Sequence, residues 1–141
     1  MTITRSGLDI GAIELVDQKW PVVIVRPLDQ LTDQQLDNFL HHFRDVASSR
    51  GGDHSLVLDL RFYKDMPATQ RRRISEEMEK GTVISRCHAT AMVFTSPVLK
   101  LVLTAILWLN KPKHELKVFS DIDAAMTWAS EKLSDGLQKI A

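Results

Sequence analysis

Short apolar runs alternate with amphipathic segments along most of this chain. Three runs are nearly continuous, as in strands covered on both faces: Val22–Val25, which is entirely β-branched, Ser55–Leu60 and Ala89–Phe94. The partly alternating run Ala12–Val16 lies close enough to the first of them to predict a hairpin. A short run at Leu116–Phe119 predicts the last of five strands.

Four segments between and after these strands carry helical signals. The clearest begins at Thr32, because Gln35 completes a capping box and Asp33 complements the positive end of the helix dipole. Gly51 and Gly52 end this helix. Its apolar residues share one face, namely Leu36, Phe39, Leu40, Phe43 and Ala47.

Three more helices follow the later strands. One runs from Asp65 to about Lys80 and has a thin apolar face of Ile74 and Met78, which Met66 or Pro67 would extend. Another opens at Pro97 and reaches about residue 110. Ser120 is the predicted cap of the last helix. That helix carries a long apolar stripe, made of Ile122, Ala125, Met126, Ala129, Leu133, Leu137 and Ile140.

The predicted order of elements is ββαβαβαβα. Alternating strands and helices after an initial hairpin predict an α/β fold with a mixed, mostly parallel five-stranded sheet and right-handed crossovers. The length of 141 residues suits one domain, so we expect a single domain over 1–141 with its core at about 12–140.

Composition and charge narrow the function classes. The chain is 44% hydrophobic and 26% charged, which is typical of a globular domain, and its net charge of zero argues against nucleic acid as a partner. The charge is uneven, with −4 on residues 1–60, +6 on 61–113 and −2 on 114–141. This pattern indicates either a solvated face with local ion pairs or contact with an acidic partner.

The sequence shows no recognisable catalytic or metal-binding constellation. Cys87 is the one cysteine, and adjacent Cys87 and His88 on an extended chain would face opposite ways, which is poor geometry for a nucleophile and its base. We therefore expect no enzyme, no metal and no cofactor. No targeting or integral membrane segment is visible, so we expect a cytoplasmic protein.

Several stretches together resemble the STAS and SEC14-like superfamily, in particular its SpoIIAA-like branch. They are Leu56–Leu60 running into a loop and helix, Pro67 with Gln70-Arg71, Ala91–Phe94 and the ending Val118–Trp128. The resemblance spans roughly residues 12–134. It implies a non-enzymatic interaction or switch module, of the kind found in anti-sigma-factor antagonists, transporter appendages and binders of lipids or small ligands.

The same resemblance points to the turn that follows the third strand. In anti-sigma-factor antagonists a serine at the start of that helix is phosphorylated, whereas this chain lacks the Asp-Ser-x-Gly motif and reads Asp65-Met-Pro-Ala-Thr69. Thr69 is the only hydroxyl in the matching turn and becomes the candidate phospho-switch, with Asp65 and the following arginines as candidate contacts. The alternative is that Asp65 or Thr69 only caps the helix.

The densest basic run follows directly, at Arg71, Arg72 and Arg73. The pairs Arg72–Glu76 and Arg73–Glu77 have i, i+4 spacing and would leave Arg71 the freest for a partner. The run is interpreted either as a partly neutralised, solvated face or as a contact for an anion, a phosphate or an acidic protein.

The third predicted helix is apolar nearly all round. Over 98–109 only Lys100 and Thr104 interrupt it, and about 18 Å of helix is too short to cross a bilayer. It is either buried, or an interface with Trp108 as an anchor, or a contact for an apolar ligand or a membrane surface. The candidate contact residues are Leu99, Leu103, Ile106, Leu107 and Trp108.

These observations favour a regulatory or protein-interaction module that forms a dimer through the third helix. The alternative is a SEC14-like binder of an apolar ligand or lipid, which requires an apolar cavity of about 300 Å³ or more.

Overall fold

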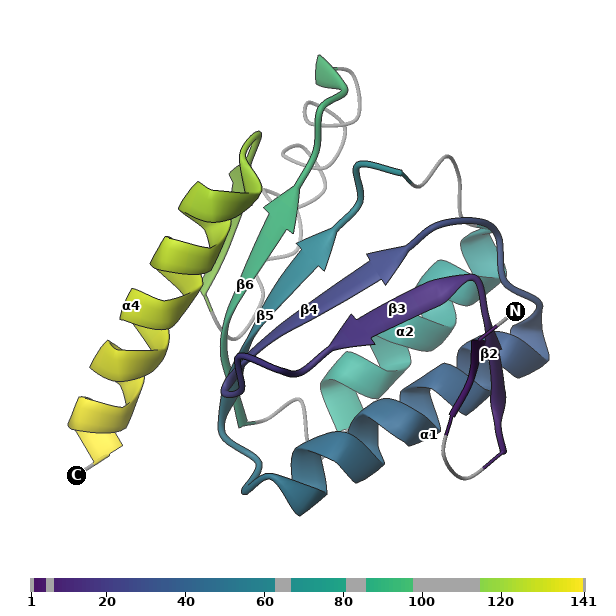
Figure 1. Cartoon of the computed structure of the whole chain (residues 1–141), viewed down its shortest axis with the longest axis horizontal. Coiled ribbons are helices and arrows are strands. Elements are labelled where there is room, and N and C mark those ends of the chain that lie inside the picture. Colours follow the sequence, from purple (N-terminus) through teal and green to yellow (C-terminus); the bar gives the residue numbers. More distant parts are fainter. Residues whose placement is uncertain (1, 5–6, 63–66, 81–85, 98–114, 141) are drawn as a thin grey trace.

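A five-stranded mixed sheet forms the centre of the molecule (Figure 1). The computed structural model describes residues 2–4, 7–62, 67–80, 86–97 and 115–140. The strands follow one another across the sheet in chain order: β3 (Ile13–Val16), β4 (Val22–Pro27), β5 (His54–Asp59), β6 (Cys87–Val93) and β7 (Glu115–Phe119). β3 pairs with β4 antiparallel and the other three pairings are parallel, which confirms the predicted α/β class and sheet.

Helices cover both faces of this sheet (Figure 1). α1 (Asp33–Ser49) and α2 (Ala68–Lys80) lie on one face, and α4 (Ile122–Ile140) lies on the other. Alternate residues of β4 divide between these faces, because Val23 and Val25 pack with α1 while Val22 packs with α4. Apart from Pro97, the third predicted helix falls outside the described residues.

The start of α1 is the one that the sequence predicts. Thr32 Oγ1 accepts a hydrogen bond from the Gln35 backbone at 3.1 Å, and Gln35 Oε1 accepts one from the Thr32 backbone at 3.0 Å. Gly51 and Gly52 follow its end with φ of +99° and +92°, a region that favours glycine. Four residues of the predicted apolar face are buried, namely Leu36, Phe39, Leu40 and Ala47.

The start of α4 differs from the prediction by one residue. The Asp121 carboxylate, rather than Ser120, accepts hydrogen bonds from the backbones of Asp123 at 3.2 Å and Ala124 at 3.3 Å. The prediction of Ser120 as the cap was therefore wrong. A carboxylate reaches the same free N–H groups and adds a negative charge at the positive end of the helix dipole.

A two-stranded ribbon at the N-terminus was not predicted. β1 (Thr2–Ile3) pairs antiparallel with β2 (Asp9–Gly11), and both strands are too short for a periodicity to be recognised. Ile10 on β2 is 2% exposed and packs in the cluster that α1 covers, so the core begins before residue 12. Asn38 of α1 donates to the Asp9 carbonyl at 2.9 Å and holds the ribbon in place.

Two apolar clusters lie on the two faces of the sheet. The cluster on the α1 side contains Ile10, Ile13, Val23, Val25, Leu36, Phe39 and Leu40. The cluster on the α4 side contains Val22, Val57, Ala91, Val93, Ala125 and Ala129. Among the described residues, no helix is long and apolar enough to cross a membrane.

Candidate functional site

A buried carboxylate lies at the carboxyl end of the parallel strands. Asp59 is the last residue of β5 and its side chain is fully buried, while Arg26 reaches it from the neighbouring β4. Arg26 Nε donates to Asp59 Oδ2 at 2.7 Å. Arg61, two residues beyond Asp59, turns back and donates from Nε to Oδ1 and from Nη2 to Oδ2, both at 2.8 Å. The carboxylate is therefore held by two guanidinium groups at once.

These contacts fix the charge of Asp59. Burial by itself raises the pKa of this carboxyl group, but hydrogen bonds from Arg61 and then Arg26 outweigh it and lower the pKa to about 2. The bond to Asp59 in turn raises the pKa of Arg61, and the nearby charges of Asp121 and Asp123 add to that effect. Because the acid stays ionised, it anchors the loop that leaves β5 rather than serving as a proton donor.

Phe62, the residue that follows Arg61, is an exposed aromatic side chain. Phe62 is 52% exposed, and the Arg61 guanidinium lies 5.3 Å from the centre of its ring. Pro67, which directly precedes α2, is also exposed, as are Thr69 and Arg72 of its first turns. These four exposed residues follow one another along the chain from the end of β5 into α2, and we call Phe62, Pro67, Thr69 and Arg72 the α2 entry surface. Carboxyl ends of parallel strands are the usual place for binding sites in α/β folds.

The structure places the candidate phospho-switch on this surface. Thr69 is the second residue of α2 and is exposed. A residue inside the first turn is not the N-cap, so the alternative that Thr69 caps the helix was wrong. Asp65 lies outside the described residues, and phosphorylation of Thr69 stays a prediction.

The three arginines of α2 have different surroundings. Arg73 contacts Asp37 of α1 at 3.0 Å and Glu77 at 3.2 Å, so the predicted i, i+4 pair with Glu77 is confirmed. Arg72 and Glu76 are both exposed and, in the part of the chain that the structure describes, form no ion pair with each other, against the prediction. The side chain of Arg71 is outside the description.

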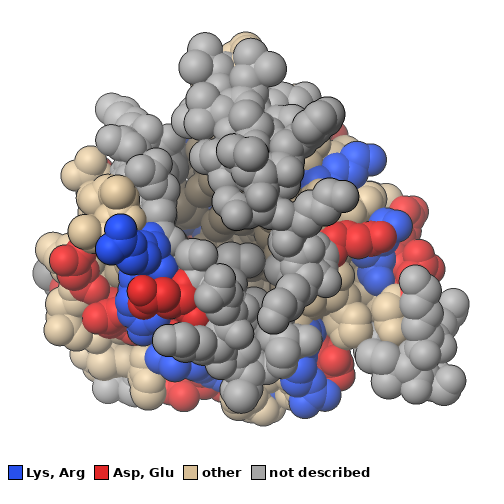
Figure 2. All heavy atoms as spheres, turned by 180° about the vertical axis from the view of Figure 1, so that it is seen from behind, with Lys and Arg blue, Asp and Glu red and all other residues tan. Residues whose placement is uncertain are grey.

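The uneven charge of the sequence is partly balanced within the fold. Three arginines of the basic middle segment are paired with aspartates of the acidic first 60 residues, namely Arg61 with Asp59, Arg73 with Asp37 and Arg86 with Asp53. Figure 2 shows the result, with basic and acidic side chains next to one another on the face seen from behind. Arg72 is thus the exposed arginine of α2 without such a pair among the described residues.

The candidate contact residues of the third helix lie outside the described residues. They are Leu99, Leu103, Ile106, Leu107 and Trp108. The dimer and ligand interpretations of that helix therefore stay predictions.

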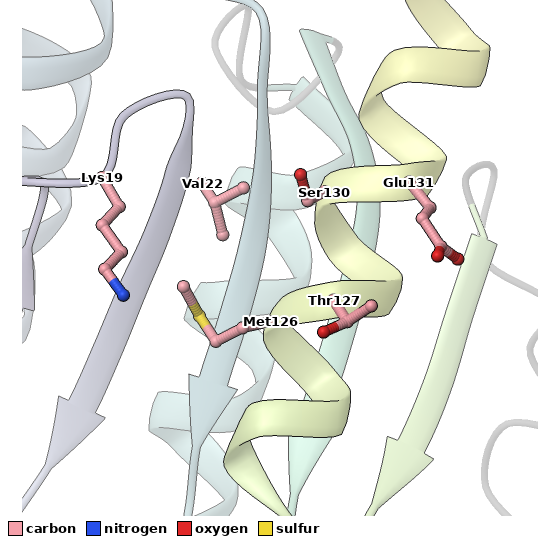
Figure 3. A pocket seen from close by; sticks show the side chains of 6 residues that line it. All are labelled: Lys19, Val22, Met126, Thr127, Ser130 and Glu131. Atoms are coloured by element: carbon pink, nitrogen blue, oxygen red, sulfur yellow. The ribbon is translucent and has the colours of Figure 1, made fainter.

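A groove of about 400 Å³ opens between the β3–β4 turn and α4 (Figure 3). Val22 and Met126 supply apolar surface, whereas the other lining residues are polar, namely Lys19, Thr127, Ser130 and Glu131. The lining is thus mixed, whereas sites for lipids and apolar ligands are lined predominantly by apolar side chains.

Cys87 and His88 face opposite sides of the sheet, as the alternation of an extended strand requires. Cys87 is 7% exposed, burial raises the pKa of its thiol, and its sulfur contacts Thr90. His88 Nε2 donates to Asp53 Oδ1 at 3.1 Å, and the ring lies against Gly136 of α4. Among the described residues, no group of three histidine, cysteine or acidic side chains is arranged to hold a metal ion.

Comparison with solved structures defines the fold class. The chain is similar to an uncharacterised protein of the DUF3478 family with a SpoIIAA-like fold from Shewanella loihica PV-4. The two chains are 12% identical with a TM-score of 0.63, over 84% of this chain and 92% of the other. The protein therefore has a SpoIIAA-like fold, which confirms the resemblance predicted from the sequence.

The family is defined by sequence. Residues 46–132, more than half of the chain, match the family model described as a domain of unknown function, DUF7793. The protein belongs to this family. No curated protein matches the chain significantly.

The arginine clamp on Asp59 was not predicted. Asp59 lies near the end of the apolar run Ser55–Leu60, but the sequence pattern does not supply its partners. Two signals point to them: Arg26 follows four apolar residues of β4, and Arg61 follows Asp59 by two positions. A cation inside or just beyond a buried strand needs a nearby anion, because an unpaired buried charge is costly.

Proposed function

We propose that this protein is a non-enzymatic regulatory module that binds another protein through the α2 entry surface. The observation that carries the proposal is Phe62, a large aromatic side chain that is 52% exposed on the loop leaving β5, just after the Asp59 clamp. Exposed aromatic residues next to arginine are the typical anchors of protein interfaces. The Asp59 clamp supports this role, because it fixes the loop before Phe62 and reduces the conformational entropy that binding would remove.

The SpoIIAA-like fold supports a non-enzymatic role, since such domains are typically interaction and switch modules. Exposure of Thr69 on the same surface supports a switch there, because a phosphate at this position would add negative charge next to the exposed Arg72. The single, buried cysteine supports a reducing, cytoplasmic location. A second copy of this chain is one partner that the surface could bind.

Site-specific photo-crosslinking tests the proposal. A photoreactive phenylalanine analogue replaces Phe62 in the protein expressed in its own host, and the same analogue replaces the exposed Gln18 of the β3–β4 turn as a control. We expect a discrete adduct from position 62 and none from position 18, identified by mass spectrometry as a partner protein or a second copy.

Binding by purified components then gives the decisive measurement. We expect Phe62→Ala to weaken binding of the crosslinked partner at least about tenfold. Ile3→Ala is the matched control, because Ile3 is a similarly exposed apolar side chain, at 55%, on the N-terminal ribbon. Equal affinities of the Phe62 variant and the wild type would refute the proposed surface.

A further inference from the structure

The face that α2 turns toward α1 is polar. An amphipathic helix normally buries apolar residues at i, i+3, i+4 and i+7. In α2 this stripe reads Gln70, Arg73, Ile74 and Glu77, of which Gln70 is 4% and Glu77 8% exposed. Among the described side chains of α2, only Ile74 packs against an apolar cluster. Among the described side chains of α2, the contacts with the rest of the fold are therefore mainly polar.

The first set of these bonds joins the start of α2 to the start of α1. Gln70 Nε2 donates to the Leu31 carbonyl at 2.7 Å and to Asp33 Oδ1 at 3.1 Å. Leu31 directly precedes the Thr32 cap, so the amide fixes the first turn of α2 against a rigid point. Both bonds cross the space between elements that lie more than 30 residues apart in the chain.

The second set of bonds surrounds Glu77. Arg73 Nη1 donates to Glu77 Oε2 at 3.2 Å, while its Nε donates to Asp37 Oδ1 of α1 at 3.0 Å. Arg44 of α1 lies 3.2 Å from Glu77 Oε1, but that oxygen is buried and accepts no aligned hydrogen bond. Glu77 is therefore paired by charge on both sides and only partly satisfied by hydrogen bonds.

A buried carboxylate of this kind gives a weak contact. Its desolvation cost is similar to the attraction it gains, and the two arginines are 36% and 40% exposed, so salt screens them. Asp59 is the counterexample within the same chain, because its two oxygens accept bonds from two arginines.

We propose that α2 is a releasable element, held on α1 by the polar contacts of Gln70, Arg73 and Glu77. Release would move Thr69 and Arg72 with the helix while Phe62 stays on the loop anchored by Asp59, and so would change the α2 entry surface. The inference rests on the proposed function, since α2 carries half of that surface. The module would bind its partner when α2 lies on α1 and would not bind it when α2 is released.

Hydrogen exchange measured by mass spectrometry on the full chain tests the release directly. In Glu77→Gln, which keeps the shape and removes the charge, we expect exchange over residues 68–80 to rise about tenfold. Exchange of β5, β6 and α4 should stay at the wild-type rate. Raising NaCl from about 0.05 M to about 1 M should increase exchange of α2 in the wild type in the same selective way.

Three further variants make the test independent of misfolding. Glu76→Gln is the matched control, because Glu76 is the exposed neighbour of Glu77 on the same helix. Arg44→Gln removes the arginine of α1 that pairs with Glu77, and we expect hydrogen exchange of α2 to rise about threefold. Glu77→Met should restore slow exchange, since an apolar residue of similar size pays no desolvation cost.

The results separate the release from the proposed function. Unchanged exchange of α2 in Glu77→Gln and Arg44→Gln, or an equal rise over α4, would overturn the releasable helix and leave the binding result for Phe62→Ala untouched. A selective rise in α2 exchange together with unaltered binding by Phe62→Ala would support release and refute the α2 entry surface.

Discussion

The two helices α4 and α2 are held on this fold by opposite kinds of contact. α4 presents Ala125 and Ala129, both fully buried, to Val57, Ala91 and Val93 of the sheet. α2 presents Gln70 and Glu77 to α1. The first contact is close-packed and dry, whereas the second is polar and partly open to solvent.

This difference determines how each helix responds to a change in conditions. Apolar contacts between small residues depend on shape and are insensitive to salt, so α4 stays in place unless the core itself is disturbed. Contacts between polar groups must compete with water, and their net contribution is small and condition-dependent. A helix held by polar contacts, as α2 is, can therefore leave its position more easily than one held by apolar packing.

Asp59 shows that polarity alone does not make a contact weak. Its carboxylate is as deeply buried as the alanines of α4, yet both of its oxygens accept bonds from arginines. Glu77 has one oxygen without an aligned donor. The decisive property is therefore whether every buried polar atom is satisfied.

The largest expected loss of unfolding free energy comes from a substitution in α4. Leu133→Ala should lower the free energy of unfolding by about 3 kcal/mol, because Leu133 is 4% exposed and its truncation leaves a cavity. Urea denaturation followed by circular dichroism measures the change, with the exposed neighbour Ser134→Ala as the control. A loss below about 1 kcal/mol would mean that α4 is not packed as the structure shows.

Substitution of Asp59 should cause the next largest loss of stability, and the size of this loss should depend on pH. Its pKa is lowered from 3.8 to about 2, so the folded state holds its proton less tightly than the unfolded state does. The stabilisation, roughly 2 kcal/mol, is fully present well above pH 3.8 and is lost as pH falls through about 2.

The measurement compares acid unfolding of the wild type with that of Asp59→Asn. The variant should be less stable near neutral pH, and the difference should shrink toward about pH 2. Asp135→Asn, which removes an exposed carboxylate of α4, is the control for the change in net charge. A stability difference that does not vary with pH would contradict the clamp.

Gln70 should give a smaller effect. Gln70→Ala removes the bonds to Leu31 and Asp33 and should cost about 1 kcal/mol of unfolding free energy. Thr69→Ala next to it, an exposed residue, is the control for helix propensity. If both variants lost the same unfolding free energy in urea denaturation, the hydrogen bonds of Gln70 would not contribute to holding α2 on α1.

The smallest effect is expected at Arg72. Because its side chain is exposed and no ion pair of Arg72 is found among the described residues, Arg72→Ala should change stability by less than about 0.5 kcal/mol. Its effect should appear in partner binding instead, as a loss that decreases with added salt. A stability loss equal to that of Arg73→Ala, measured in the same urea series, would show that Arg72 belongs to the structural contacts.

The sequence by itself determined α1, the five strands of the central sheet and the face of α1 that packs on that sheet. The capping box at Thr32, the apolar face of α1 and the five strands follow from signals within a few residues of one another. Such signals act through local backbone geometry and side-chain periodicity, so they can be recognised before the chain is folded. The position of the cap of α4 was wrong by one residue because Ser120 and Asp121 are both good caps.

Only the tertiary structure decided which distant polar groups meet. Arg26 reaches Asp59 because β4 and β5 are neighbours, and Gln70 reaches Leu31 because α2 lies beside α1. The sequence left open whether the basic middle segment forms local ion pairs or contacts an acidic partner, and the fold pairs three of its arginines with acids from the first 60 residues. Charge attracts at a distance and without a preferred spacing in sequence, so no local pattern identifies these partners.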